Sequence, residues 1–246
     1  MDNIFTRQHT VTEMDVDCFG RCKYGVLLYL AQEAATGHCD LLKLDWDSMA
    51  QKGLFWAVIR THVQINRLPR LGEKLSVRTW PMPTTRTAFP RAVVICDENG
   101  NELVQVLSLW VLMDQATRAM VLPGRSGVDV PGLLTGCEIA VPGSIVPHSG
   151  EHTASRAVTF SELDRNGHMN NTYYLNWVAD LLPAAFHKDR PAREFTVCYL
   201  SEATEGQDVR LLYQLSEEGV FQVDGYTQKT DDHSKNTRVF SVKMVF

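Results

Sequence analysis

The stretch LDRNGHMNN, residues 163–171, gathers more chemically versatile side chains than any other part of the chain. It places the Asp164 carboxylate, the Asn166 amide and the His168 imidazole at every second position. An imidazole titrates near neutral pH and can accept or donate a proton there. The same residue types also form simple turns, in which Asp and Asn side chains cap backbone N–H groups. Which interpretation applies depends on the elements around them.

An apolar run, TYYLNWVADLL, follows directly and predicts the element that would hold these groups in place. Its large side chains recur with helical spacing and form one broad face. We expect one helix from about Asn171, which would cap it, to the residue before Pro183. The face consists of Tyr173, Tyr174, Trp177, Val178, Leu181 and Leu182. We interpret its aromatic members as core rather than as a substrate box.

This polar loop and helix have a counterpart in the first half of the chain. The segment VTEMDVDCFGRCKYGVLLYLAQE, from Val11, aligns without a gap with VTFSELDRNGHMNNTYYLNWVAD, from Val158. Identities occur at an offset of 147 residues, and of 134 residues further on, in the pairs Asp17/Asp164, Gly20/Gly167 and Gly72/Gly206. The sequence therefore predicts an internal repeat.

Both halves continue with strand-like runs after the helix. These are FWAVIRTHVQI, KLSVRTW and FPRAVVICDENGNELVQVLSLWVLMD in the first half, and EFTVCYL, VRLLYQLSEEGVFQVDGYTQ and TRVFSVKMVF in the second. Asn-Gly and Glu-Gly at the tips DENGN and SEEGV predict hairpin turns. Residues 123–152 are rich in Pro and Gly and predict a linker between domains 1–122 and 153–246. A helix followed by antiparallel strands, twice, is an α+β fold.

Together these features resemble the acyl-ACP thioesterases, whose pattern is D-x-N-x-H-x-N-N-x-x-Y-x-x-W. This chain matches it with Asp164, Asn166, His168, Asn170, Asn171, Tyr174 and Trp177. The resemblance covers essentially the whole chain. It implies two tandem hot-dog domains, each a long central helix packed on a curved antiparallel β-sheet. It also implies that domain 1–122 is non-catalytic and forms the acyl-chain pocket, while domain 153–246 is catalytic.

The family also places a functional glutamate in a Y-R-R-E-C context after the helix. The corresponding segment here, CYLSEA, identifies Glu202, three residues after Tyr199. Ala203 stands at the family's cysteine, so no thiol at that position can act with His168. Cys198 remains an alternative nucleophile, which we expect on the same strand face as Glu202.

The implied activity is hydrolysis of a thioester, which needs a base for water and donors for the developing oxyanion. We expect Glu202 and His168 to activate water together, and burial against the helix would make Glu202 more basic. Asn166 would hold the water or the thioester carbonyl. The backbone amides at residues 170–172 would face the oxyanion. Which of Glu202 and His168 accepts the proton stays open.

The repeat separates catalytic from structural residues. At the positions of Asn166, His168 and Glu202, the first half has Phe19, Arg21 and Leu68, and therefore no base. We expect one site per chain, in the second half. Because Asp17 is retained opposite Asp164, a loop-fixing role for Asp164 is as plausible as a catalytic one.

The composition excludes several other classes. A net charge of −5 argues against a nucleic-acid binder, and no apolar run is long enough to span a membrane. The six cysteines form no C-x-x-C pair, and the first residues do not resemble a signal or transit peptide. We therefore expect a cytoplasmic protein with reduced thiols. Asn is a poor zinc ligand and no metal-binding spacing is present, so we expect neither metal nor cofactor.

The expected partner is an acyl carrier protein that bears a fatty acyl chain. The chain itself is expected to be a monomer or a homodimer. Because carrier proteins are acidic, this protein would need a positively charged surface to bind one. Residues 60–91 contain one acid, Glu73, against seven bases, Arg60, Arg67, Arg70, Lys74, Arg78, Arg86 and Arg91. An acyl-CoA thioesterase, a hot-dog hydratase or dehydratase, and a non-catalytic acyl-binding module remain as alternatives.

Overall fold

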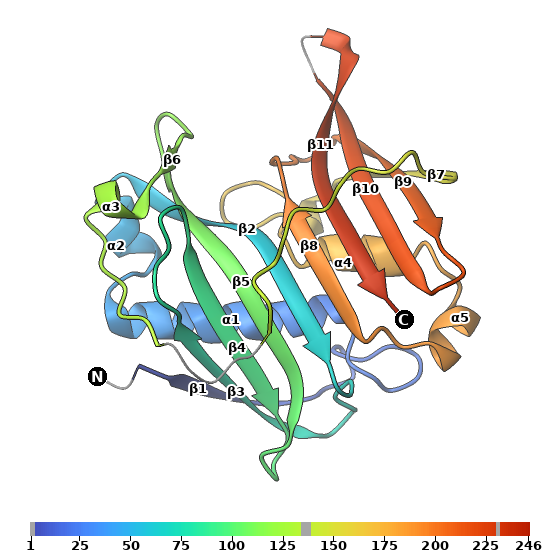
Figure 1. Cartoon of the computed structure of the whole chain (residues 1–246), viewed down its shortest axis with the longest axis horizontal. Coiled ribbons are helices and arrows are strands. Elements are labelled where there is room, and N and C mark those ends of the chain that lie inside the picture. The colour runs from blue at the N-terminus through green and yellow to red at the C-terminus, as the bar shows by residue number, and fades with distance from the viewer. Residues whose placement is uncertain (1–2, 134–138, 230–231) are drawn as a thin grey trace. The chain divides into compact units, whose positions relative to one another are not determined.

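The computed structural model describes residues 3–133, 139–229 and 232–246. The chain divides into two compact units, Met1–Pro142 and Gly143–Phe246 (Figure 1). None of the helices in the described part of the chain is long and apolar enough to cross a membrane.

The first unit is a helix on an antiparallel sheet. Its strands are β1 (Phe5–Thr10), β2 (Leu54–Ile65), β3 (Lys74–Pro81), β4 (Phe89–Cys96), β5 (Glu102–Asp114) and β6 (Met120–Val121). The main strands pair in the order β1-β3-β4-β5-β2, and β6 pairs with β5. Helix α1 (Tyr24–Leu42) lies across one face of this sheet, and the short helices α2 (Trp46–Ala50) and α3 (Pro123–Ser126) lie near the ends of strands (Figure 1).

The strands of this unit are buried because both faces of the sheet are packed against other parts of the chain. All eight residues of β4 are buried. Leu27, Leu30 and Ala34 form part of the buried face of α1, which contacts β1 and β3. On the other face, Leu133 and Ile139 pack with Trp80 of β3 and its neighbours. A strand covered on both sides has a continuous apolar sequence, as FPRAVVIC does apart from Arg91.

The second unit repeats the arrangement of the first. Its strands are β7 (His152–Ala157), β8 (Glu194–Tyr199), β9 (Asp208–Leu215), β10 (Val220–Lys229) and β11 (Asp232–Val245). They pair in the order β8-β11-β10-β9-β7, antiparallel throughout. Counted along each unit, the strand order is the same in both. The internal repeat predicted from sparse identities is therefore present in the topology.

The predicted hairpin tips are also present. Gly100 has a φ of 83° in DENGN and Gly219 has a φ of 81° in SEEGV, values that favour glycine. The Asp97 carboxylate accepts hydrogen bonds from the amides of Asn99 and Asn101, which closes the first turn.

The helix of the second unit is shorter than the sequence predicts. Helix α4 spans Tyr173–Ala179, and α5 (Ala184–Asp189) begins directly after Pro183. Between them, the amides of Leu181 and Leu182 donate to carbonyls three residues back, so the chain tightens before the proline. The expectation that Asn171 caps this helix is wrong. Instead, the Asn170 side chain accepts a hydrogen bond from the Thr172 amide at 3.0 Å.

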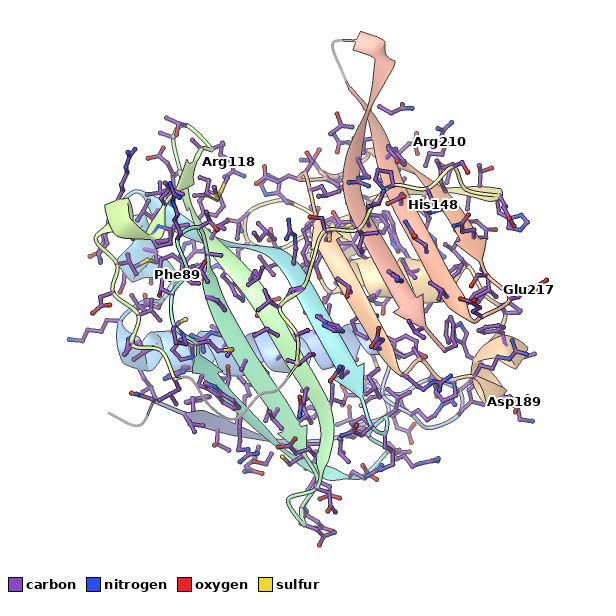
Figure 2. All side chains as sticks on the ribbon, in the orientation of Figure 1. Phe89, Arg118, His148, Asp189, Arg210 and Glu217 are labelled. Carbon is purple, nitrogen blue, oxygen red and sulfur yellow. The ribbon has the colours of Figure 1, made fainter. Side chains whose placement is uncertain are left out.

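The Pro/Gly-rich stretch predicted as a linker contains α3 and otherwise no regular element among its described residues before β7. Residues 143–151 are attached to the sheet of the second unit. Gln222 of β10 donates to the Val146 carbonyl at 2.7 Å, and the His148 amide donates to the buried Asp224 carboxylate at 3.2 Å. His148 is labelled on this segment in Figure 2.

Candidate active site

The loop that carries the polar run is organised by the Asp164 carboxylate. Its Oδ1 accepts hydrogen bonds from the amides of Asn166 at 2.8 Å and His168 at 3.2 Å. The Asp164 amide donates back to the His168 carbonyl at 2.8 Å. Gly167 between them has a φ of 76°, a conformation that costs a side chain about 1–2 kcal/mol. These hydrogen bonds therefore fix the backbone position from which the His168 side chain extends.

The first unit builds the same loop around Asp17. Its Oδ1 accepts hydrogen bonds from the amides of Phe19 at 2.8 Å and Arg21 at 3.0 Å, and Gly20 has a φ of 70°. Since this unit has neither an imidazole nor an amide side chain at these positions, the shared aspartate serves the backbone. This geometry gives Asp164 a structural role that does not depend on catalysis.

A backbone pairing brings His168 beside Glu202. The Met169 amide donates to the Ala203 carbonyl at 2.8 Å, and His168 forms an isolated bridge with Thr204. As a result, His168 Nε2 lies 3.3 Å from Glu202 Oε2, an ion pair when the imidazole is protonated. The side chains are 21% and 49% exposed, respectively. Both side chains are therefore accessible to water.

Two expectations about Glu202 are wrong. Strand β8 ends at Tyr199, so Glu202 lies in the following turn and shares no strand face with Cys198. The Cys198 side chain is buried instead, with Sγ 3.7 Å from the Gly143 carbonyl oxygen. With half of its side chain exposed, Glu202 is also not buried against α4.

The polar groups around this pair are partly engaged with one another. The Asn166 Nδ2 donates to Asp164 Oδ2 at 3.2 Å, which orients the carboxamide. Of the amides at residues 170–172, that of Asn170 donates to the Glu162 carbonyl at 2.8 Å and that of Thr172 to the Asn170 side chain. Only the Asn171 amide has no acceptor among the described residues. The helix start thus offers one donor rather than the set expected.

An aromatic cluster surrounds Tyr174 of α4. The Tyr174 ring packs against Phe240 at 4.5 Å, Tyr199 at 5.9 Å and Trp177 at 6.2 Å between centroids. Burial raises the pKa of Tyr174 well above its ordinary value, and the charges of Asp164 and Glu202 raise it further. Its hydroxyl therefore stays protonated across the physiological range.

Sequence reasoning missed two groups of this cluster. Glu162 Oε1 accepts a hydrogen bond from Trp177 Nε1 at 2.6 Å, and Tyr199 donates from its hydroxyl to the Asn171 carbonyl at 3.2 Å. The T-x-x-E spacing of Thr159 and Glu162, a capping box, was the available signal for the first.

The corresponding position in the first unit has no base. Arg21 faces Asp17 at 3.3 Å and its guanidinium lies 4.8 Å from the centre of the Phe19 ring. Leu68, at the position of Glu202, is buried. At the positions of His168 and Glu202, this loop therefore has an arginine and a leucine, neither of which can act as a base.

The basic residues between 60 and 91 do not form one free positive surface. Arg91 is buried, where it donates to His38 Nδ1 at 3.3 Å and Thr79 Oγ1 at 3.2 Å. Arg67 pairs with Glu73 at 2.8 Å, and Arg78 lies 3.6 Å from Glu102. Arg70, Lys74 and Arg86 are the exposed members without a described carboxylate partner. Among the described residues, no group of His, Cys, Asp and Glu has the arrangement of a metal site.

Similar proteins identify the class. The model of the acyl-ACP thioesterase N-terminal domain matches residues 2–122, and that of the C-terminal domain matches residues 148–241. An acyl-ACP thioesterase structure from Bacteroides thetaiotaomicron is 25% identical, with a TM-score of 0.89 over 100% of this chain and 98% of its own. The 12:0-ACP thioesterase of Umbellularia californica is 21% identical, with a TM-score of 0.82 over 100% of this chain and 97% of its own.

The fold is therefore the double hot-dog, as predicted. The chain belongs to the acyl-ACP thioesterase family. Among plant relatives, the palmitoyl-acyl carrier protein thioesterase of Gossypium hirsutum is 22% identical over 87% of this chain. The dodecanoyl-[acyl-carrier-protein] hydrolase of Umbellularia californica is 26% identical over 75% of it. The chain spans about half the length of these curated relatives, 55% and 52%.

Proposed function

We propose that this protein hydrolyses the thioester of fatty acyl-[acyl carrier protein], releasing a free fatty acid and ending fatty acid synthesis. The proposal is carried by the His168–Glu202 pair, with 3.3 Å between Nε2 and Oε2, in the one half of a duplicated fold that has these residues. The names of the relatives support the substrate class, because they refer to palmitoyl and dodecanoyl groups on a carrier protein.

In the proposed reaction, the pair of Glu202 and His168 removes a proton from water as the oxygen attacks the thioester carbon. Negative charge develops on the carbonyl oxygen, toward which the Asn171 amide and the Asn166 carboxamide would donate. The C–S bond then breaks, and the protonated pair returns its proton to the leaving sulfur. Water and thioester become carboxylic acid and thiol, and the side chains end in their starting state. Asp164 supports this sequence by holding the loop.

The test is hydrolysis of acyl-ACP substrates of graded chain length, with acyl-CoA and enoyl thioesters alongside. His168→Ala and Glu202→Ala should each lower kcat by roughly 10²- to 10⁴-fold, the usual contribution of a general base. Arg21→Ala, at the matched position of the first unit, is the control and should leave kcat unchanged. Full activity of the His168→Ala/Glu202→Ala double variant would disprove the assignment. Hydration of an enoyl thioester without hydrolysis would favour the alternative hot-dog chemistry.

Other features of the proposal remain predictions. The first unit is expected to form the acyl-chain pocket without taking part in the chemistry. The acyl carrier protein is the expected partner, and the exposed cations Arg70, Lys74 and Arg86 are the remaining candidates for contacting it. The protein is expected in the cytoplasm, as a monomer or homodimer.

A further inference from the structure

The residue just before the candidate catalytic loop joins three parts of the second unit. Glu162 Oε2 accepts hydrogen bonds from the Thr159 amide and hydroxyl, both at 2.9 Å. Its Oε1 accepts one from Trp177 Nε1 at 2.6 Å, and its carbonyl accepts one from the Asn170 amide at 2.8 Å. Glu162 therefore holds the chain before the loop, the residue after the loop, and helix α4.

These contacts continue to the segment that carries Glu202. Trp177 packs edge-on against Tyr174, and Tyr174 packs against Tyr199 at the end of β8. The Tyr199 hydroxyl donates to the Asn171 carbonyl, back at the foot of the loop. The loop of His168 and the strand leading to Glu202 are thus joined by a closed circuit of hydrogen bonds and ring contacts.

The first unit retains the scaffold but lacks the circuit. Asp15, at the position of Glu162, accepts hydrogen bonds from the Thr12 amide and hydroxyl in the same way, both at 2.8 Å. Leu30 and Leu27 stand where Trp177 and Tyr174 are, and neither can donate a hydrogen bond. His9 Nε2 lies 3.0 Å from Asp15 Oδ2, the same oxygen that accepts from Thr12. The carboxylate-to-helix contact made by Glu162 and Trp177 therefore has no counterpart between the matched residues Asp15 and Leu30.

We propose that Glu162 and Trp177 are positioning residues, which set the spacing of the His168–Glu202 pair by tying α4 to both ends of the loop. This inference rests on the proposed function, because it concerns the same pair. The Trp177 side chain is 2% exposed and its N–H donates to a carboxylate. A charge-assisted hydrogen bond of this kind is stronger than one between neutral groups, and this one is partly buried. Displacement of a catalytic group by 1 Å can cost about 100-fold in rate.

The test compares Trp177→Phe, which keeps a ring but removes the donor, with Glu162→Gln, which removes the charge. Each should lower kcat between roughly tenfold and a hundredfold while KM changes less than about threefold. Because Trp177→Phe removes this hydrogen bond and Glu162→Gln weakens the same one, the double variant should be little worse than Trp177→Phe alone. The matched control is Asp15→Asn in the first unit, which should leave kcat and its pH profile unchanged.

A merely structural role predicts a different result. In that case the variants would lose thermal stability, but kcat and its pH dependence, measured well below the melting temperature, would match those of the wild type. That outcome, or an equal effect from Asp15→Asn, would overturn the proposal. If Trp177→Phe does not fold, Glu162→Gln alone decides the question.

A second measurement separates this inference from the proposed activity. Nitrogen NMR of the His168 imidazole reports its titration in the wild type and in Trp177→Phe without any substrate. A changed titration in the variant supports the positioning role even if the wild type hydrolyses no acyl thioester. An identical titration counts against it, whatever the activity.

Discussion

At the scale of single residues, the two halves separate what the loop needs from what the chemistry needs. Asp17 and Asp164 accept the same two backbone hydrogen bonds, although only one of them has an imidazole nearby. The side chains unique to the second unit, Asn166 and His168, are those that we propose act on a substrate. An acidic residue in a functional motif is thus not a catalytic residue on that account alone.

This distinction predicts matched stability losses. Asp164→Ala and Asp17→Ala should each lower the free energy of unfolding by about 1–3 kcal/mol, because two backbone N–H groups lose their acceptor. Urea denaturation measures the change, and kcat is measured in parallel. Asp17→Ala should retain wild-type kcat, while Asp164→Ala should lower it through the displaced His168. A loss of kcat in Asp164→Ala without any loss of stability would instead place Asp164 in the chemistry.

A buried histidine in the first unit predicts a pH dependence of folding. Burial, with the adjacent Arg91 cation, lowers the pKa of His38 from its ordinary 6.5 to about 4. Between pH 6.5 and pH 4, His38 binds a proton in the unfolded chain but stays largely neutral in the folded chain. The unfolding free energy therefore falls as the pH is lowered. The loss reaches about 3 kcal/mol near pH 4, at 1.36 kcal/mol for each unit of pKa.

Denaturation as a function of pH measures this effect. His38→Gln should remove the part of the slope between pH 6.5 and pH 4 that comes from His38. His152→Gln, a substitution of an exposed histidine in the second unit, should leave the slope as in the wild type. Equal slopes for the wild type and His38→Gln would show that His38 takes up its proton in the folded state as readily as in the unfolded one.

At the scale of elements, the sequence was most informative where the pattern is local. Helical spacing located both helices, and Asn-Gly and Glu-Gly located the hairpin tips. The contact between Glu162 and Trp177 was missed, because it depends on how α4 is rotated toward the chain before the loop. Glu202 was found only through the resemblance to a family. It lies 34 residues beyond His168, and no periodicity connects a loop residue with a distant turn.

The helix start supplies a prediction at this scale. The Asn170 side chain accepts hydrogen bonds from the Thr172 amide at 3.0 Å and hydroxyl at 2.9 Å. Asn170→Ala should therefore lower the unfolding free energy by about 1 kcal/mol, the usual value of a side-chain hydrogen bond to the backbone. Lys23, at the matched position before α1, makes no such cap, so Lys23→Ala is the control. Equal effects of the two substitutions on thermal unfolding would contradict the assigned role.

At the scale of the whole molecule, one topology appears twice with different contents. Both units have the same strand order and the same Asp-Gly loop, yet one loop ends in a base and the other in an arginine that faces Asp17. Such a duplication retains the residues that fold the loop, since both copies require them. The first unit keeps the same fold with Arg21 and Leu68 at the positions of His168 and Glu202.

This asymmetry predicts one functional site per chain. A non-hydrolysable acyl-ACP analogue should bind with a stoichiometry of one per chain in isothermal titration calorimetry. Arg21→His combined with Leu68→Glu would place an imidazole and a carboxylate at the matched positions of the first unit. It should not restore hydrolysis to the His168→Ala/Glu202→Ala variant, because Leu30 and Leu27 offer no donor to tie α1 to the loop. Binding of two analogues, or restored turnover, would show that both halves can act and that the polar circuit around Trp177 is not required.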